Sequence, residues 1–210
     1  ALIVIIPTAD SDPLPDLPSD LMRFRDAGAS NVKVLKTRIP GELDNRSTRI
    51  LLEKASAIWF SGGRQWRLVD LFEGTEALNH IRKVLCRQGV IGGSSAGALI
   101  QAEYLVRGDP LGNRNVMAAG YTRGFNFLPG TAIDQHMLQR DRFKDMMKVI
   151  QRYPQLLGIG IDERTAMEVS GSKATVVGRH QVHFFNAPRG EYQSLSAGQS
   201  YELIKRIRIP

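Results

Sequence analysis

The sequence predicts an α/β protein built on a doubly wound, mostly parallel β-sheet with a β-rich C-terminal part. Three observations lead to this prediction. Short apolar runs alternate with longer, helix-like stretches from residue 1 to residue 162. The stretches between these runs are long enough to hold the crossover helices that return a chain to a parallel neighbour. After Glu163 the pattern changes to strand-like segments separated by turns.

The individual elements follow from local signals. The predicted parallel strands share an apolar centre bounded by Gly, Pro or polar residues, and they span 1–7, 32–35, 57–60, 90–93, 131–134 and 157–162. The predicted helices span 19–27, 43–55, 68–72, 75–87 and 138–153. Ser19 or Asp20 would cap the first helix, and Asp44 or Asn45 the second. The late strands are 167–169, 174–177, 181–185 and 201–207, and 105–130 is expected to be a long loop with short strands that line a site.

The chain has 210 residues, of which 42% are hydrophobic and 23% charged, as is usual for a globular protein. This length suits one domain, 1–210, and no internal repeat or low-complexity linker divides it. No apolar run approaches the ~20 residues that a membrane-spanning helix needs. The net charge is +7, but Lys and Arg are scattered and not interleaved with aromatic residues. A basic surface that serves solubility is therefore favoured over nucleic-acid binding.

The most informative stretch is Gly92-Gly93-Ser94-Ser95-Ala96-Gly97-Ala98. An apolar pair precedes it and a helix-like pair follows, which predicts a buried strand that turns sharply into a helix. Gly93-x-Ser95-x-Gly97 fits the G-x-S-x-G nucleophile elbow, in which small neighbours allow a strained turn to present one hydroxyl. A tightly packed corner without function is the alternative, because short motifs also match by chance.

Polar residues gather directly after several predicted strands. In an open parallel sheet, ligands bind beyond the carboxyl ends of the strands. The residues there are Gly62-Gly63-Arg64-Gln65, Ser95, Asp134-Gln135-His136 and Asp162-Glu163. A hydroxyl, an imidazole and a carboxylate at one edge are the groups of a Ser–His–acid relay, in which the histidine takes the serine proton and the acid orients the ring.

His136 is the candidate general base, because among the four histidines it alone falls at a predicted strand end. Asp162 and Glu163 compete for the role of the acid. Alternation along the strand places them on opposite sides, so one can face the site while the other faces solvent or a cap. The residues alone do not decide between them.

Other chemistries lack their motifs. The sequence has no H-E-x-x-H, no cysteine cluster and no histidine pair at metal spacing, so we expect no metal. A G-x-G-x-x-G motif after a strand is also missing, and we expect no cofactor. The order Ser95, His136, acid differs from the Ser, acid, His order of α/β-hydrolases.

Four blocks of the sequence resemble the cyanophycinase family of serine peptidases. They are Phe60-Ser61-Gly62-Gly63-x-Gln65, Gly92-Gly93-Ser94-Ser95-Ala96-Gly97-Ala98, Asp134-Gln135-His136-x-x-x-Arg140-x-Arg142 and Gly158-Ile159-Gly160-Ile161-Asp162-Glu163-x-Thr165-Ala166. The blocks occur in the family's order between residues 59 and 169. The resemblance implies a flavodoxin-like or class I glutamine amidotransferase-like fold.

The resemblance also implies a role for each site residue. Ser95 would be the nucleophile, His136 the base and Glu163 the orienting acid. The backbone amides of Ala96 and of the Gly62-Gly63 turn would form the oxyanion hole. The implied substrate-binding residues are Gln65, Asp134, Gln135, Arg140 and Arg142. Arginine suits a substrate carboxylate because its guanidinium binds bidentately, although a solvated first helix turn is the alternative for both arginines.

Three features depart from the family pattern. Arg64 stands where relatives tend to carry Asp or Asn, and Asp145 stands where they carry a third arginine. Because Asp145 is three residues after Arg142 on a predicted helix, we expect the two to pair and to lower the positive potential of the pocket. The family also has a Gly-rich strand and a helix before the first strand predicted here, so either the sheet is smaller or these elements precede residue 1.

We therefore expect a metal-independent serine exopeptidase that hydrolyses aspartyl or β-aspartyl (isoaspartyl) peptides, with cyanophycin or β-Asp-Arg fragments as candidate substrates. The expected partner is such a peptide, with no nucleic acid and no membrane, and a homodimer is an alternative to a monomer. A peptide-binding domain of the same fold without catalysis is one alternative function, and a nucleic-acid binder is another. The compartment stays open between the cytoplasm, which we favour, and export.

Overall fold

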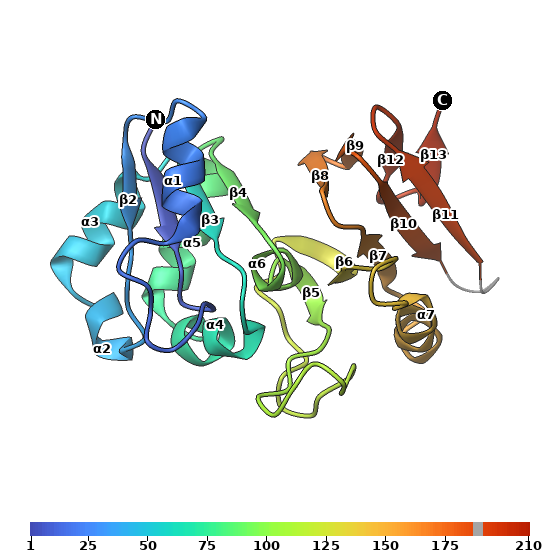
Figure 1. Cartoon of the computed structure of the whole chain (residues 1–210), viewed down its shortest axis with the longest axis horizontal. Helices are drawn as coiled ribbons and strands as arrows, with labels where there is room; N and C mark the ends of the chain where they lie inside the picture. Colours follow the sequence, from blue (N-terminus) through green and yellow to red (C-terminus); the bar gives the residue numbers. More distant parts are fainter. Residues whose placement is uncertain (187–190) are drawn as a thin grey trace.

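The computed structural model of the chain describes residues 1–186 and 191–210 and arranges the strands in three sheets (Figure 1). The first sheet has the order β2-β1-β3-β4, and all of its pairs are parallel. Its strands are β1 (Ile3–Ile6), β2 (Val32–Val34), β3 (Ala57–Phe60) and β4 (Val90–Gly93). Strand β4 therefore lies at the edge of this sheet, on the side that faces the rest of the molecule (Figure 1).

The second sheet has the order β11-β10-β7-β6-β5, with β5, β6 and β7 parallel and the other pairs antiparallel. Its strands are β5 (Ala102–Leu105), β6 (Leu128–Gln135), β7 (Leu157–Ile161), β10 (Gln181–Asn186) and β11 (Glu191–Ser196). The third sheet is antiparallel in the order β13-β12-β9-β8. Its strands are β8 (Thr165–Ser170), β9 (Lys173–Gly178), β12 (Ser200–Glu202) and β13 (Ile207–Ile209). The strands after Glu163, β8 to β13, form the β-rich C-terminal part that the sequence predicted.

Helices cover both faces of the first sheet, as a doubly wound arrangement requires. The helices are α1 (Ser19–Asp26), α2 (Pro40–Leu43), α3 (Arg46–Lys54), α4 (Gln65–Phe72), α5 (Glu76–Cys86), α6 (Ala96–Leu99) and α7 (Phe143–Arg152). On one face, Leu21 of α1 packs in a cluster with Ile5. On the other face, Leu52 of α3 and Ile81 of α5 pack in a cluster with Ile58. Alternate residues of each strand thus enter different apolar layers.

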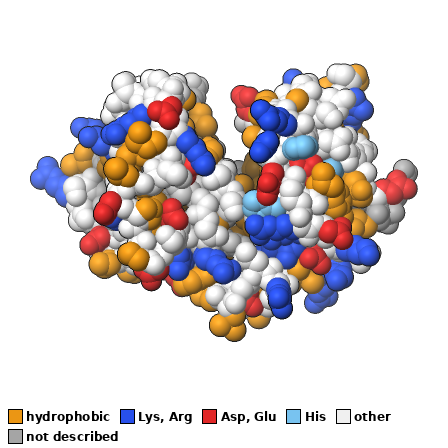
Figure 2. Space-filling model, in the orientation of Figure 1, with side chains coloured by type: hydrophobic (Ala, Val, Ile, Leu, Met, Phe, Trp, Pro, Cys, Tyr) orange, Lys and Arg blue, Asp and Glu red, His pale blue; other side chains and the backbone are white. Residues whose placement is uncertain are grey.

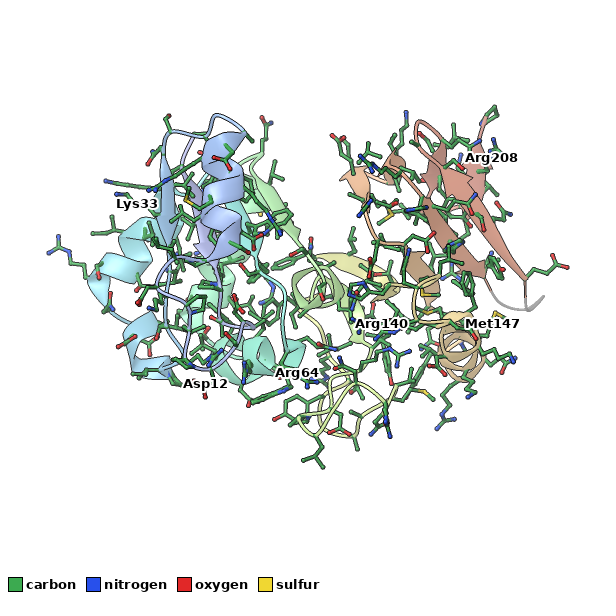
Figure 3. All side chains as sticks on the ribbon, in the orientation of Figure 1. Asp12, Lys33, Arg64, Arg140, Met147 and Arg208 are labelled. Carbon is green, nitrogen blue, oxygen red and sulfur yellow. The ribbon has the colours of Figure 1, made fainter. Side chains whose placement is uncertain are left out.

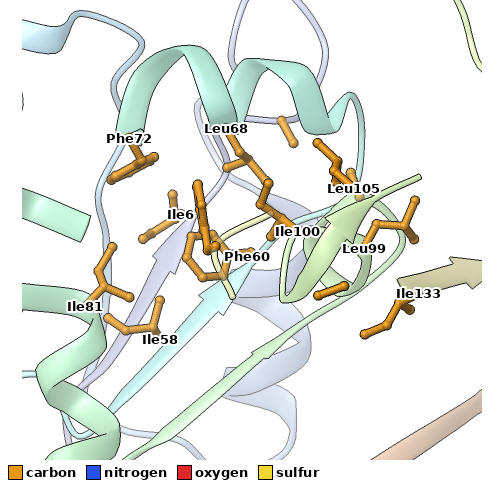
Figure 4. Packing of buried hydrophobic residues seen from close by; sticks show 14 of the residues in the cluster. Ile6, Ile58, Phe60, Leu68, Phe72, Ile81, Leu99, Ile100, Leu105 and Ile133 are labelled. Atoms are coloured by element: carbon orange, nitrogen blue, oxygen red, sulfur yellow. The ribbon is translucent and has the colours of Figure 1, made fainter. Parts of the chain in front are cut away.

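One hydrophobic cluster joins the three sheets. It contains Phe60 of β3, Leu99 of α6, Ile133 of β6 and Tyr201 of β12, each at most 2% exposed. Figure 4 shows how Leu99 and neighbouring residues fill the space between the first sheet and Ile133. The short helix α6 therefore links the sheet that precedes Ser95 to the sheet that follows it.

The structure corrects several expected element bounds. The parallel strands are divided between two sheets instead of being joined in one. Helix α7 begins at Phe143, five residues after the expected start at residue 138, because residues 136–142 form hydrogen-bonded turns. Asn45 caps α3 by accepting a hydrogen bond from the Thr48 amide, whereas no side chain caps α1. Strand β11 was not expected, and the expected strand 201–207 is replaced by β12 and β13.

The described part of the chain contains no helix that is both long and apolar enough to cross a membrane.

Candidate active site

Ser95 lies at the turn between β4 and α6, in a backbone conformation that few residues other than glycine adopt. Its φ is 53° and its ψ is −115°. Such a conformation costs on the order of 1–3 kcal/mol, so the surrounding structure must hold it in place. The carbonyl oxygen of Ser95 accepts hydrogen bonds from the amides of Ala98 and Leu99, at 2.9 and 3.1 Å. These bonds connect the strained residue directly to the first turn of α6.

The glycines of the motif are required by close contacts with β3. A Cβ at Gly97 would lie 2.0 Å from the carbonyl oxygen of Phe60, and a Cβ at Gly93 would lie 2.4 Å from the carbonyl oxygen of Gly97. No real side chain fits at such distances when the obstacle is backbone. The G-x-S-x-G spacing therefore allows α6 to fold back against β3 while Ser95 is presented at the turn.

The turn after β3 lies against the same serine. A Cβ at Gly62 would be 3.2 Å from the Cβ of Ser95, and Gly63 has a φ of 134° with the carbonyl oxygen of Ala9 close behind it. Within the described residues, the Ala96 amide donates no hydrogen bond. The two amides expected to form the oxyanion hole, those of Gly63 and Ala96, thus belong to segments that flank Ser95.

His136 and Glu163 meet beyond the ends of β6 and β7. The Nδ1 atom of His136 lies 2.9 Å from Oε1 of Glu163, and the His136 ring is largely buried, with 22% of its side-chain area exposed. His136 also has a positive φ, 56°. When Nδ1 carries the proton and donates it to Glu163, the unprotonated Nε2 can accept a proton from a nucleophile.

No hydrogen bond joins Ser95 Oγ to the His136 ring within residues 1–186 and 191–210. Helix α6, which follows Ser95, packs against β6, which ends one residue before His136. Hydrogen bonds between a nucleophile and its base are often long without substrate and shorten when substrate binds. The structure thus brings two of the three expected catalytic residues into direct contact and places the third on an adjoining element.

Asp162 holds the turns that carry His136 and Glu163. It is 4% exposed, and its carboxylate accepts hydrogen bonds from the amides of Leu138, at 3.0 Å, and Gln181, at 3.2 Å. The side-chain oxygen of Gln139 in turn accepts from the Glu163 amide at 3.2 Å. Of the two acids that the sequence left open, Glu163 contacts the imidazole and Asp162 caps a neighbouring turn.

Two opposing influences act on the pKa of His136. Burial lowers the pKa most strongly, and the positive charge of Arg140 lowers it further. The hydrogen bond to Glu163 raises it, but the net pKa lies below its ordinary value. His136 is therefore mostly neutral at neutral pH, as a general base must be.

The expected substrate-binding residues fall into two groups. Gln65, Asp134 and Arg142 are buried, and they bind other parts of the protein. The side-chain amide of Gln65 donates to the carbonyl oxygens of Val106 and Arg107. Asp134 and Arg142 form an ion pair of 2.8 Å, and Arg142 also donates to the carbonyl oxygen of Gln135. The hydrogen bonds of these three side chains are therefore made to other parts of the protein.

In the second group, Gln135 is half-buried and Arg140 is exposed. Arg140 lies in the turn before α7, toward the centre of the molecule (Figure 3). The side-chain oxygen of Gln135 is buried and has no hydrogen-bond partner among the described residues. Figure 2 shows a notch between the two halves of the molecule, with histidine, Lys or Arg, and acidic side chains gathered on one wall.

Asp145 does not pair with Arg142, contrary to the sequence prediction. Arg142 is the N-cap residue of α7, and its guanidinium forms an ion pair with Asp134. Asp145 instead accepts a hydrogen bond of 2.8 Å from Arg107, which sequence reasoning had not singled out. The sequence held only a weak sign that Arg107 is buried and paired. Arg107 directly follows the apolar run Tyr104-Leu105-Val106, and a charged residue buried there needs a partner.

Within the described ranges, no three His, Cys, Asp or Glu side chains are grouped as a metal site would need.

Known proteins resemble this chain in sequence and in structure. The sequence model of peptidase family S51 matches residues 2–177. A cyanophycinase from Geminocystis herdmanii (strain PCC 6308) is 32% identical over 167 residues, which cover 79% of this chain and 61% of that protein. A cyanophycinase from Synechococcus elongatus is 31% identical over 189 residues, which cover 87% of this chain and 58% of that protein. The chain thus spans about three fifths of the length of these relatives.

A solved structure is also similar. The crystal structure of a peptidase from an acI-B1 actinobacterium matches with a TM-score of 0.73 and 25% identity, over 96% of this chain and 83% of that one. These matches confirm both the α/β fold class and the family resemblance that the four sequence blocks indicated. The chain belongs to peptidase family S51.

Proposed function

We propose that this chain is a serine exopeptidase that hydrolyses aspartyl or β-aspartyl peptides. The observation that carries the proposal is the pairing of a strained serine elbow with a hydrogen-bonded imidazole and carboxylate. Ser95 is presented by a turn whose glycines pack against β3, and His136 is bound to Glu163 at 2.9 Å. Membership of a peptidase family and the similarity to two cyanophycinases support the reaction class.

The proposed reaction has two steps. His136 Nε2 takes the proton of Ser95 Oγ, and this oxygen attacks the carbonyl carbon of the scissile bond. The C–N bond then breaks, the amine leaves with the proton from His136, and the acyl group remains on Ser95. A water molecule gives a proton to His136 and attacks the ester carbonyl. The bond between this carbon and Ser95 Oγ then breaks, the acid is released, and His136 returns the proton to Ser95 Oγ. Glu163 keeps the imidazole oriented in both steps.

Backbone amides would stabilise the negative charge on the carbonyl oxygen in each step. The amides of Gly63 and Ala96 are the proposed donors, because both flank Ser95. Losing one such donor typically costs about 3 kcal/mol of transition-state stabilisation.

The aspartyl specificity would come from groups beside the imidazole. The exposed guanidinium of Arg140 is the proposed partner of the substrate carboxylate, because it is near enough to His136 to affect its pKa. Gln135, which is half-buried next to His136, is proposed to line the same site. Gln65, Asp134 and Arg142 are proposed to form the wall behind these two residues.

The test is a panel of Asp-X and β-aspartyl dipeptides, including β-Asp-Arg, assayed with the wild-type chain, Ser95→Ala and Ser94→Ala. We expect Ser95→Ala to reduce kcat to the level of the blank, since removing a triad serine typically costs about 10⁶-fold. Ser94→Ala is the matched control, because it removes the neighbouring hydroxyl and should retain most of the activity. A chelator should change nothing.

A serine-directed organophosphonate provides a second measurement. We expect it to inactivate the wild-type chain and to add its mass to the peptide that contains Ser95. Turnover that persists in Ser95→Ala would contradict the mechanism. A wild-type chain that binds the peptides but neither cleaves them nor reacts with the phosphonate would be a peptide-binding domain instead.

A further inference from the structure

Arg107 is the most heavily bonded buried cation beside the proposed site. It lies two residues after the end of β5, is 5% exposed and has a φ of 59°. Its Nε donates to Asp134 at 2.9 Å, its Nη2 to Asp145 at 2.8 Å, and its Nη1 to the carbonyl oxygen of Asn113 at 2.8 Å. The attraction of the two carboxylates raises the pKa of Arg107 despite its burial, so that the guanidinium stays charged.

On one side, Arg107 is bonded to the segment that carries the base. Asp134 is fully buried and is held at both oxygens, by Arg107 at Oδ2 and by Arg142 and the Gln135 amide at Oδ1. Asp134 comes two residues before His136. A shift of this carboxylate therefore moves the backbone from which the imidazole projects.

On the other side, the loop that contains Arg107 and Asn113 is bonded to the segment beside Ser95. The side chain of Gln65 donates to the carbonyl oxygens of Val106 and Arg107, and Arg64 Nη1 donates to the side-chain oxygen of Asn113 at 3.0 Å. Arg64 and Gln65 directly follow the Gly62-Gly63 turn that lies against Ser95. Figure 3 shows Arg64 at the end of α4 that faces this loop.

Arg64 and Asp145, the two residues that depart from the family pattern, thus both bind the segment of residues 107–113. Arg64 binds Asn113, and Asp145 binds Arg107. Arg107, Arg142, Asp134 and Asp145 together carry two positive and two negative charges, so their formal charges cancel. The hydrogen bonds among these residues within the protein therefore explain why Arg64, Arg107 and Asp145 occur together, without a role in binding substrate.

We propose that Arg107 is a positioning residue that fixes the distance between the Ser95 segment of the first sheet and the His136 segment of the second sheet. The inference rests on the proposed function, because it assigns Arg107 a role in the same reaction. Arg107 touches no reacting atom; its side chain acts through Asp134 on His136, and through Asn113 on Arg64, which follows the turn beside Ser95. A misplacement of about 1 Å between reacting groups can cost 10²-fold in rate.

The test compares Arg107→Lys, Asp145→Asn and Arg87→Lys with the wild-type chain. Lysine keeps the charge but cannot bind Asp134, Asp145 and Asn113 at once, because it lacks the planar fork of donors. We expect Arg107→Lys to lower kcat and the rate of phosphonate inactivation by about 10²-fold, with KM nearly unchanged. Asp145→Asn should lose less than Arg107→Lys, because the bond to Asp134 remains. Arg87→Lys, whose arginine binds the carbonyl oxygens of Leu52 and Ala55, should behave as wild type.

A readout independent of turnover is the NMR signal of the His136 ring, assigned with His136→Gln. We expect Arg107→Lys to shift this signal and to leave that of His80 in place. An unchanged His136 signal with wild-type kcat would overturn the inference, as would a larger loss for Asp145→Asn than for Arg107→Lys. An Arg107→Lys chain that does not fold would also overturn it, because Arg107 would then be needed for folding alone.

Failure of the proposed function gives a different result. In that case the wild-type chain neither cleaves the peptides nor reacts with the phosphonate, and the His136 signal alone decides whether Arg107 positions the ring. If the wild-type chain is active and Ser95→Ala is not, normal kinetics in Arg107→Lys reject only the role of Arg107.

Discussion

At the scale of single residues, the protonation of His136 decides when the proposed site is active. Burial and Arg140 lower its pKa, and Glu163 raises it. A general base works only in its neutral form, so activity is lost as the pH falls through this pKa. Because the net pKa lies below the ordinary histidine value, the wild-type chain should keep its activity at mildly acidic pH.

Arg140→Gln tests this balance. Removing the positive charge should raise the pKa of His136, so that the acid limb of kcat/KM moves to higher pH. KM for aspartyl substrates should also increase, because the proposed carboxylate partner is lost. The measurement is the pH profile of kcat/KM, with Arg25→Gln as a control that changes the charge equally on a distant exposed helix position. An acid limb that stays in place or moves to lower pH would contradict this electrostatic role.

At this scale the sequence predicted candidate groups but few of their contacts. Ser95, His136 and an adjacent acid pair were singled out because each stands at the end of a predicted strand, and their catalytic roles stay predictions. The pairing of Asp145 was wrong because the guanidinium of Arg142 binds the buried Asp134, and Asp145 binds Arg107. Arg107 could not be found because its partners come from β6 and α7, and only the folded chain brings them together.

At the scale of elements, the turn from β4 into α6 depends on the lack of side chains at two glycines. Strands β3 and β4 have the bounds that the sequence predicted, because short apolar runs end there in Ser-Gly and Gly-Gly. The start of α7 was placed too early at Leu138, which is largely exposed in a turn before the helix. Pattern alone does not distinguish a helix from a turn whose hydrogen bonds come from a distant residue such as Asp162.

Gly97→Ala tests the packing of this turn. The added methyl group would overlap the carbonyl oxygen of Phe60, and overpacking of this kind typically costs about 1–3 kcal/mol, or more where backbone must move. We expect a lower free energy of unfolding in urea, together with a loss of phosphonate labelling at Ser95. Gly41→Ala is the control, because nothing lies within 4 Å of its added methyl group and it lies in a helix. Equal stability of the two variants would show that the turn is not tightly packed.

At the scale of the whole molecule, the site depends on the packing between separate sheets. The first sheet supplies Ser95 through β4, and the second supplies His136 and the turn of Glu163 through β6 and β7. The sequence predicted the α/β class and the β-rich part after Glu163, since both follow from local periodicity. It did not predict the division into three sheets, because strand pairing depends on contacts between distant residues.

Leu99→Ala tests this packing. Leu99 is 1% exposed in the cluster between the two sheets, so its truncation should lower the free energy of unfolding by about 2–5 kcal/mol (Figure 4). Leu111→Ala, at a leucine that is 97% exposed, should change it by less than about 0.5 kcal/mol. Chemical denaturation followed by circular dichroism measures both. Similar values for the two variants would mean that α6 contributes little to joining the halves.

The positive φ of Ser95 has a consequence for how such a protein can change over generations. Glycine adopts this conformation without strain, so replacing Ser95 with glycine would remove the strain energy and raise the free energy of unfolding. Selection for thermal stability alone would therefore favour variants without the Ser95 hydroxyl, and this hydroxyl would be retained only under selection for the proposed activity.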